Sequence, residues 1–302
     1  MPMSYPEHDK SSFFKYTSAS SAIKILETSK VICRSPREFN DPFDVQSGLH
    51  FDFDVESMPD QILSRIEKLV SLKDRPELST AEPFGELVIR MWEKKSTHGF
   101  PKEKLRELAR PLLVLLKEQT ALFQKQYQDA WWNQFLPRLR VFSVSEAHDN
   151  LLMWSHYSKD HTGVVFEFRV LPQEDNPLCV AKPVQYCKNP PALFSEREWL
   201  DEIFGVRELD GSAFYFRYAY IKIDVSAYER EWRVWDLLPQ VEEKLHSYYD
   251  LRPNEIAAVY LGCRISSDEK ATLLRLLSEH PNAKVFQARR ALDEFRLDFS
   301  AV

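Results

Sequence analysis

Glycine is scarce in this chain, with 7 residues in 302, and the glycine-rich phosphate loops GxGxxG and GxxxxGK[ST] are both absent. Their absence counts against a Rossmann dehydrogenase, a P-loop ATPase and a protein kinase, although nucleotide binding by other means stays open. The four cysteines form no CxxC pair and no zinc-finger spacing. Reduced, mostly buried thiols and no metal centre are therefore expected.

The chain also has no excess of basic over acidic residues and no long run of apolar residues. The formal net charge is -6, so general nucleic-acid binding is not expected. No run approaches the roughly 18 apolar residues that a membrane span requires. The first ten residues contain no apolar core of a secretory signal. These absences predict a cytoplasmic protein with no membrane partner.

Hydrophobic residues make up 44% of the chain, which is enough for a large core, and strand and helix patterns occur in irregular order. Helices are predicted over about 58–135, and strand patterns lie on both sides of that block. The pattern predicts one α+β domain over 1–302, with a helical insertion at about 58–135. Strands are predicted at 13–16, 31–33, 141–145, 163–170, 180–186, 231–235, 256–262, 285–288 and 296–299. The segment 213–222 fits a strand or a helix.

The segment 229–233, Glu-Arg-Glu-Trp-Arg, has the sharpest chemical pattern. In an extended strand, Glu229, Glu231 and Arg233 point to one side, and Arg230 and Trp232 point to the other. Two carboxylates and a guanidinium on one face can orient ribose hydroxyls or stabilise a developing cation. A solvent-facing strand with a salt bridge beside a core tryptophan explains the same pattern.

Two other segments contain polar and aromatic groups. In 153–157, Trp154 and Tyr157 share a helix face, and His156 lies beside them, although such residues are more often core than site. In 39–44, Asn40-Asp41-Pro42 is a turn signal, so the two polar side chains can simply satisfy local backbone groups.

Taken together, these segments resemble a bacterial family catalogued as domain of unknown function 2971, over about residues 12 to 290. The family name carries no reaction. The resemblance rests on a Lys-Tyr strand and helix at 15–26, the turn at 39–44, a Phe-Ser strand and Trp-containing helix at 142–157, a Gly-Val strand at 163–168, the 229–233 strand and the Leu-Gly pair at 261–262.

The motif order is also similar to the ADP-ribosyltransferase arrangement, which holds NAD in the cleft of a split β-sandwich. This likeness implies a twisted, mostly antiparallel split sheet with flanking helices, NAD as substrate and an unknown macromolecular acceptor. Glu231 or Glu229 would be catalytic, bonding the nicotinamide ribose and stabilising an oxocarbenium-like centre. Tyr157 or Trp154 would stack on the nicotinamide. The implied NAD-binding residues are Lys15, Tyr16, Asn40, Ser143, Trp154, His156, Tyr157 and Arg233.

Two other hypotheses stay open. A non-catalytic ligand- or partner-binding module would have Glu231 and Arg233 ion-paired inside its core, with no cleft around Glu231. A hydrolase or nuclease would hold a metal among a set of carboxylates and a histidine, which are Asp41, Asp44, His156 and Glu231.

Overall fold

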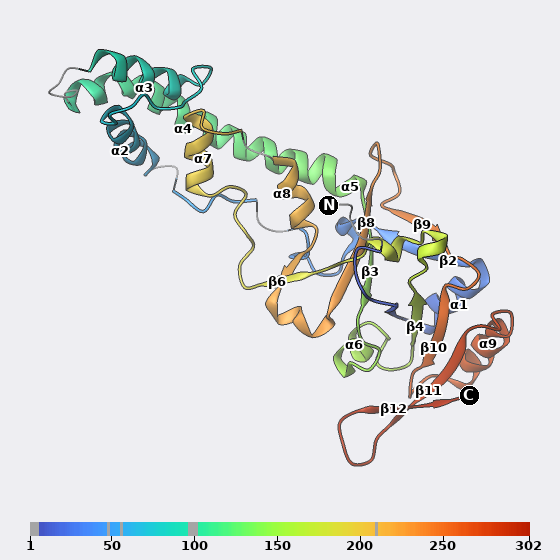
Figure 1. The fold of residues 1–302 in the computed structure, drawn as a ribbon. Coiled ribbons are helices and arrows are strands. Elements are labelled where there is room, and N and C mark those ends of the chain that lie inside the picture. The colour runs from blue at the N-terminus through green and yellow to red at the C-terminus, as the bar shows by residue number, and fades with distance from the viewer. Residues whose placement is uncertain (1–5, 47–48, 55–56, 96–101, 209–210) are drawn as a thin grey trace. The chain divides into compact units, whose positions relative to one another are not determined.

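The computed structural model describes residues 6–46, 49–54, 57–95, 102–208 and 211–302, and its α+β fold confirms the predicted class (Figure 1). The chain divides into two compact units. Unit 1 comprises Met1–Gln46, Phe135–Asn189 and Tyr220–Val302, and unit 2 comprises Ser47–Gln134 and Pro190–Ala219. Each unit is described by itself below.

Unit 1 contains a ten-stranded, mostly antiparallel sheet that is not closed into a barrel, with the order β12-β11-β10-β4-β1-β3-β2-β9. β8 branches from β3, and β5 pairs with β8. Only β10 and β11 pair in parallel in this sheet, and β6 and β7 form a separate parallel pair. The strands are β1 (Ser12–Thr17), β2 (Lys30–Arg34), β3 (Leu139–Ser145), β4 (Val164–Arg169), β5 (Lys182–Pro183), β6 (Gln185–Cys187), β7 (Ile221–Ile223), β8 (Glu231–Leu237), β9 (His246–Asp250), β10 (Ile256–Leu261), β11 (Lys284–Arg290) and β12 (Leu297–Ala301).

The sheet is split along one edge of β3. On one side, β3 pairs with β8 along its whole length. On the other side, β1 pairs with it only at Ser145 and β2 only at Val141. A strand has two hydrogen-bonding edges, so β1 and β2 must share the second one and leave a gap between them. Several of the residues predicted to form a site, among them Lys15 and Ser143, lie beside this gap.

Helices cover both faces of the sheet in unit 1. The helices α1 (Ala19–Thr28) and α9 (Ser267–Leu277) pack on one face, and α6 (Leu151–His156) packs on the other. β4 shows the alternation that makes this possible, because Phe166 and Phe168 join the first core and Val165 joins the second. Ser18, Asn150 and Ser266 cap the three helices with side-chain oxygens.

Short helices complete unit 1. The strand predicted at 180–186 is found as two short strands, β5 and β6, while Val180 ends the 3₁₀ helix Pro177–Val180. Pro183 ends β5, since proline lacks the backbone N–H that a continuous ladder needs. The other short helices are Pro36–Glu38, α5 (Leu136–Arg138), Pro172–Glu174 and Asp224–Glu229.

Unit 2 is helical. It contains α2 (Met58–Val70), α3 (Pro83–Lys94), α4 (Lys102–Ala130), α7 (Glu196–Ile203) and α8 (Gly211–Tyr218), and a π-helical turn, Trp131–Phe135, follows α4. Pro111 lies inside α4 without dividing it. The segment 190–219 joins this unit, although the sequence did not associate it with the block at 58–135. Within the described ranges, no helix is both long and apolar enough to span a bilayer.

Gly163, which precedes β4, tests how tightly this scaffold is packed. A Cβ atom at that position would lie 2.2 Å from the Thr17 carbonyl oxygen and 3.0 Å from that of Ser158. Because both obstacles are backbone, we expect Gly163→Ala to lower the free energy of unfolding by about 1–3 kcal/mol in urea titrations. Thr162→Ala, the adjacent control, should cost less. Equal stability of Gly163→Ala and the parent would contradict this packing.

Candidate functional site

Five ionisable side chains form a buried cluster at the split in the sheet. They are Asp44, Lys222, Glu229, Glu231 and Arg233, and each is less than a tenth exposed. We refer to them as the ion cluster. They come from separate places in the chain: the turn after Pro36–Glu38, β7, the end of the 3₁₀ helix Asp224–Glu229, and β8.

Arg233 joins the turn to the strand. Its Nη2 donates to Asp44 Oδ1 at 2.7 Å and Oδ2 at 2.8 Å, and its Nε donates to Glu231 Oε1 at 2.7 Å. The side chain of Arg233 is fully buried, so these carboxylates supply the partners that a buried guanidinium needs. Asp44 is therefore a structural partner of β8, a role that the turn sequence did not reveal.

Lys222 completes the cluster. Its Nζ lies 2.6 Å from Glu229 Oε2, 3.1 Å from Glu231 Oε2 and 3.2 Å from Asp44 Oδ2. The ammonium group thus lies where three carboxylates converge. Among the described residues, no group of three or more His, Cys, Asp or Glu side chains could hold a metal ion.

The two glutamates differ in their electrostatics. Burial raises the pKa of a carboxyl group, but for Glu231 the charges of Arg233 and Lys222 outweigh burial and lower its pKa. For Glu229, burial dominates, and its pKa is raised although Lys222 opposes the shift. Glu231 therefore stays ionised, whereas Glu229 takes up a proton more readily.

A cavity of about 300 Å³ opens beside the ion cluster. Both predicted catalytic residues, Glu229 and Glu231, line it. So do five of the residues predicted to bind NAD, which are Lys15, Tyr16, Asn40, Ser143 and Tyr157. The structure thus brings together side chains from β1, the turn, β3, the end of α6 and the start of β8.

Lys15 and Tyr157 both line this cavity. Lys15 Nζ donates to the Ser143 carbonyl oxygen at 2.7 Å, which supplies the partner that no strand provides there. Burial lowers the pKa of Lys15, and Glu231 opposes this shift. Tyr157 Oη donates to Glu229 Oε1 at 2.9 Å. Tyr16 lines the cavity too, although its hydroxyl donates to the Ala147 carbonyl oxygen at 2.8 Å.

Three residues predicted to bind NAD are not brought to the cavity. Trp154 is fully buried in the core beneath α6, so it has no surface for stacking on a ligand. His156 is exposed and its Nδ1 lies 3.0 Å from Tyr228 Oη. Arg233 lies behind Glu231 and makes its bonds within the ion cluster. Asp41 accepts a bond from the Phe43 amide at 2.8 Å, which is the local role expected of a turn residue.

Lys222 is the main site residue that sequence reasoning missed. It lies in the stretch 213–222, whose pattern fitted both strand and helix, and β7 has only three residues. The signal available was a lysine between two isoleucines, and that pattern also describes a solvated edge strand.

A larger cavity of about 960 Å³ adjoins the first. The two cavities share Lys15, Arg34, Glu38, Phe39 and Ser143. The larger one also has Lys24 and Lys30 in its lining, together with hydroxyl groups of α1 and β1. Lys30 pairs with Asp250 at 2.9 Å and Arg34 with Glu38 at 3.1 Å. Lys24 has no ion-pair partner among the residues that the structure describes.

The ion cluster predicts a specific pH dependence of stability. Because the pKa of Glu231 is lowered from 4.5, its stabilisation is present above about pH 4.5 and is lost as the pH falls toward the folded value. We expect Glu231→Gln to cost about 3–5 kcal/mol at pH 7, where Arg233 loses a charged partner. In urea titrations, the difference in free energy of unfolding between the parent and the variant should become smaller below pH 4.5. If this difference in free energy of unfolding were the same at pH 3 and pH 7, the assignment of Glu231 as ionised would be refuted.

No curated protein and no solved structure matches the chain. One family model does match, over residues 153–234, and its description is a protein of unknown function (DUF2971). The matched segment covers about a quarter of the chain and includes Tyr157, Lys222, Glu229, Glu231 and Arg233. Over this segment, which contains most of the ion cluster, the chain is similar to the family of unknown function that its motifs resemble.

Proposed function

We propose that this chain is an ADP-ribosyltransferase-like enzyme that cleaves the bond between nicotinamide and ribose in NAD. The observation that carries the proposal is the convergence of seven predicted residues on one cavity at the split in the sheet. They come from five separate segments of the chain, at positions 15–16, 40, 143, 157 and 229–231.

The ion cluster supplies charge of the sign that this reaction needs. With all groups ionised, its three carboxylates and two cations sum to a net charge of −1 beside the cavity. As the C1′–N bond breaks, nicotinamide leaves with the electron pair and the ribose becomes oxocarbenium-like. Bonds from Arg233 and Lys222 fix the carboxylate of Glu231, and a preorganised anion stabilises such a centre without reorienting.

The second carboxylate suits the other half of the reaction. Water or an acceptor nucleophile adds to C1′ and must lose a proton. Glu229 has a raised pKa and lies beside the cavity, so it can take that proton. Two carboxylates with pKa values shifted in opposite directions are typical of an electrostatic stabiliser and a proton acceptor.

The adjoining cavity fits the remainder of the substrate. A volume of about 300 Å³ is at the lower end of the roughly 300–1,000 Å³ typical of ligand sites, so it suits the nicotinamide ribose alone. The larger cavity offers space for the adenosine half, and Lys24 and Lys15 offer positive charge for the two phosphates. Lys15 stands where the cavities meet.

A non-catalytic binding module is the second candidate, and one observation favours it. Each oxygen of Glu231 already accepts a bond from Arg233 or Lys222, as a purely structural carboxylate would. That hypothesis also predicted no cleft beside Glu231, whereas a cavity is present. Activity measurements are needed to separate the two.

A measurement of nicotinamide release distinguishes the enzyme from the non-catalytic binding module. The parent protein should release nicotinamide from NAD in the presence of cell extract as acceptor, and Glu231→Gln should reduce the rate by about 10²–10³-fold. The assay temperature must lie below the melting transition of the variant, verified by circular dichroism. Asn40→Ala, an exposed cavity residue outside the ion cluster, should lose substrate binding with an unchanged melt. No release by the folded parent with any extract would refute the enzyme.

The larger cavity gives a binding test. Lys24→Gln should raise the KM for NAD about three- to tenfold with kcat nearly unchanged, because a phosphate contact away from C1′ contributes equally to substrate and transition state. Lys284→Gln, an exposed lysine of β11 outside both cavities, is the matched control. An unchanged KM in Lys24→Gln would remove this cavity from the NAD site.

A further inference from the structure

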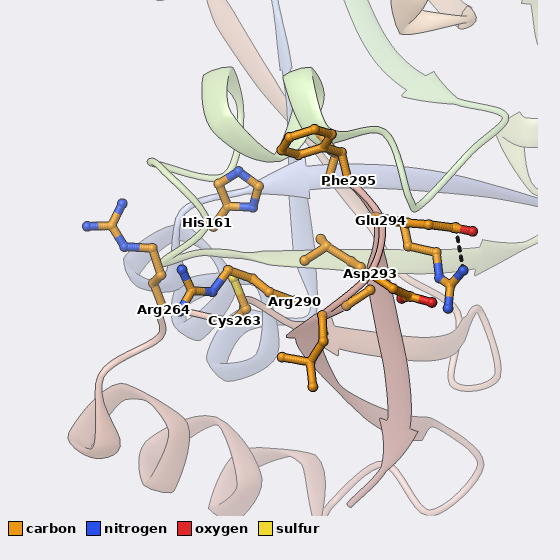
Figure 2. A pocket seen from close by; sticks show the side chains of 12 residues that line it. His161, Cys263, Arg264, Arg290, Asp293, Glu294 and Phe295 are labelled. Atoms are coloured by element: carbon orange, nitrogen blue, oxygen red, sulfur yellow. Dashed lines mark hydrogen bonds and ion pairs between the residues drawn. The ribbon is translucent and has the colours of Figure 1, made fainter.

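A third cavity, of about 450 Å³, lies at the loop that joins β11 to β12 (Figure 2). We call it the hairpin cavity. It shares no lining residue with the candidate site. α6 separates the two, because Leu151 lines the hairpin cavity and Met153 lines the other. The proposed reaction therefore does not use it. Its lining consists of Leu151, His161, Cys263, Arg264 and residues 290–297.

Much of this lining is apolar. Leu151 and the buried Leu297 form part of the wall. The loop adds Leu292 and Phe295, which are fully exposed residues. Two large apolar side chains left wholly in water on one short loop are unusual, since burying each would be favourable by roughly 1.5–3 kcal/mol. A ligand with an apolar body would cover them.

The side chains that line the hairpin cavity include more positive than negative charges. Arg296 pairs with Glu294 and with Asp298, within the loop and the start of β12. Arg264 and Arg290 have no carboxylate partner among the described residues, and Asp293 has no cationic one. Two guanidinium groups and one carboxylate leave a net charge of +1 on the hairpin cavity. Its electrostatic complement is a single negative charge.

His161 gives the cavity a neutral polar group. Its Nδ1 is buried and makes no hydrogen bond to any described residue. The ring lies parallel to that of Trp154, with centroids 6.3 Å apart. Burial, together with the charge of Arg264, lowers its pKa, so the imidazole is uncharged at neutral pH. Figure 2 shows His161, Arg290 and Phe295 around the same space.

The backbone that presents His161 is held in a rare conformation. Lys159, Asp160 and His161 all have positive φ, at 46°, 57° and 64°. The carbonyl oxygen of His161 accepts a bond from the Arg264 amide at 3.1 Å, so the turn and the strand end are fixed to each other. His161, Cys263 and Arg264 therefore keep their positions in the wall of the hairpin cavity.

We propose that the hairpin cavity binds a small monoanion with an apolar body, such as an aryl or alkyl carboxylate. The carboxylate would bind at Arg264 and Arg290. The apolar body would cover Leu151, Leu292 and Phe295. This inference stands apart from the proposed reaction, because it uses none of the residues of the candidate site.

The experiment uses a matched pair of probes, 4-phenylbutyrate and its neutral amide, in isothermal titration calorimetry with the full chain. The carboxylate should bind more tightly than the amide. Arg290→Gln and Arg264→Gln should each weaken carboxylate binding about three- to tenfold, since both groups are exposed and screened by solvent. Binding of the amide should not change. Arg289→Gln is the matched control, because the adjacent residue of β11 points to the other face of the strand and does not line the cavity.

Several outcomes would overturn the proposal. One is the absence of carboxylate binding at millimolar concentration by parent protein whose thermal melt is cooperative. Another is equal weakening by Arg289→Gln and Arg290→Gln, which would indicate a diffuse basic surface. Sedimentation with phosphatidylglycerol vesicles provides a third. Vesicle binding that needs Arg289 as much as Arg290, without binding of the free carboxylate, would assign Leu292 and Phe295 to a lipid surface instead.

Discussion

The structure of unit 1 depends on the burial of Arg233. A guanidinium with no exposed surface requires carboxylate partners, and Asp44 and Glu231 supply them at 2.7 Å. This requirement fixes the turn after Pro36–Glu38 against β8, although 189 residues separate Asp44 from Arg233. Because this turn is held against β8, Asn40 of the turn and Glu231 of β8 line the same cavity. The ion pairs are therefore the means by which distant segments form one site.

The split in the sheet follows a second constraint. β3 offers only one edge to β1 and β2, so neither can pair along its whole length. Backbone groups in the resulting gap need other partners, and Lys15 satisfies the carbonyl of Ser143. A cavity persists there because a lysine side chain fills the gap less completely than a strand would. The fold thus exposes polar groups at a position where a continuous sheet would hide them.

Sequence patterns predicted some of these features and could not predict others. The alternation in 229–233 correctly separated Glu231 and Arg233 from Trp232, because one face of β8 meets the apolar core and the other meets the cluster. The helical spacing that placed Trp154 beside Tyr157 agrees with the structure, because both pack in the core cluster under α6. It could not show that Trp154 is fully buried whereas the Tyr157 hydroxyl reaches Glu229. Lys222 was not predictable, since its role depends on tertiary contacts of a three-residue strand.

A structural and a catalytic role for Glu231 are compatible on physical grounds. Ion pairs that hold a carboxylate in one orientation also reduce the reorganisation required when positive charge develops nearby. These ion pairs also weaken the negative field of Glu231 at the cavity, because Arg233 and Lys222 offset much of the charge of its carboxylate. Glu229 compensates for this loss, since it keeps the cluster at a net charge of −1 only while it is ionised. Protonation of Glu229 would bring that net charge to zero, so the field of the ion cluster at the cavity depends on the protonation state of this one carboxyl group.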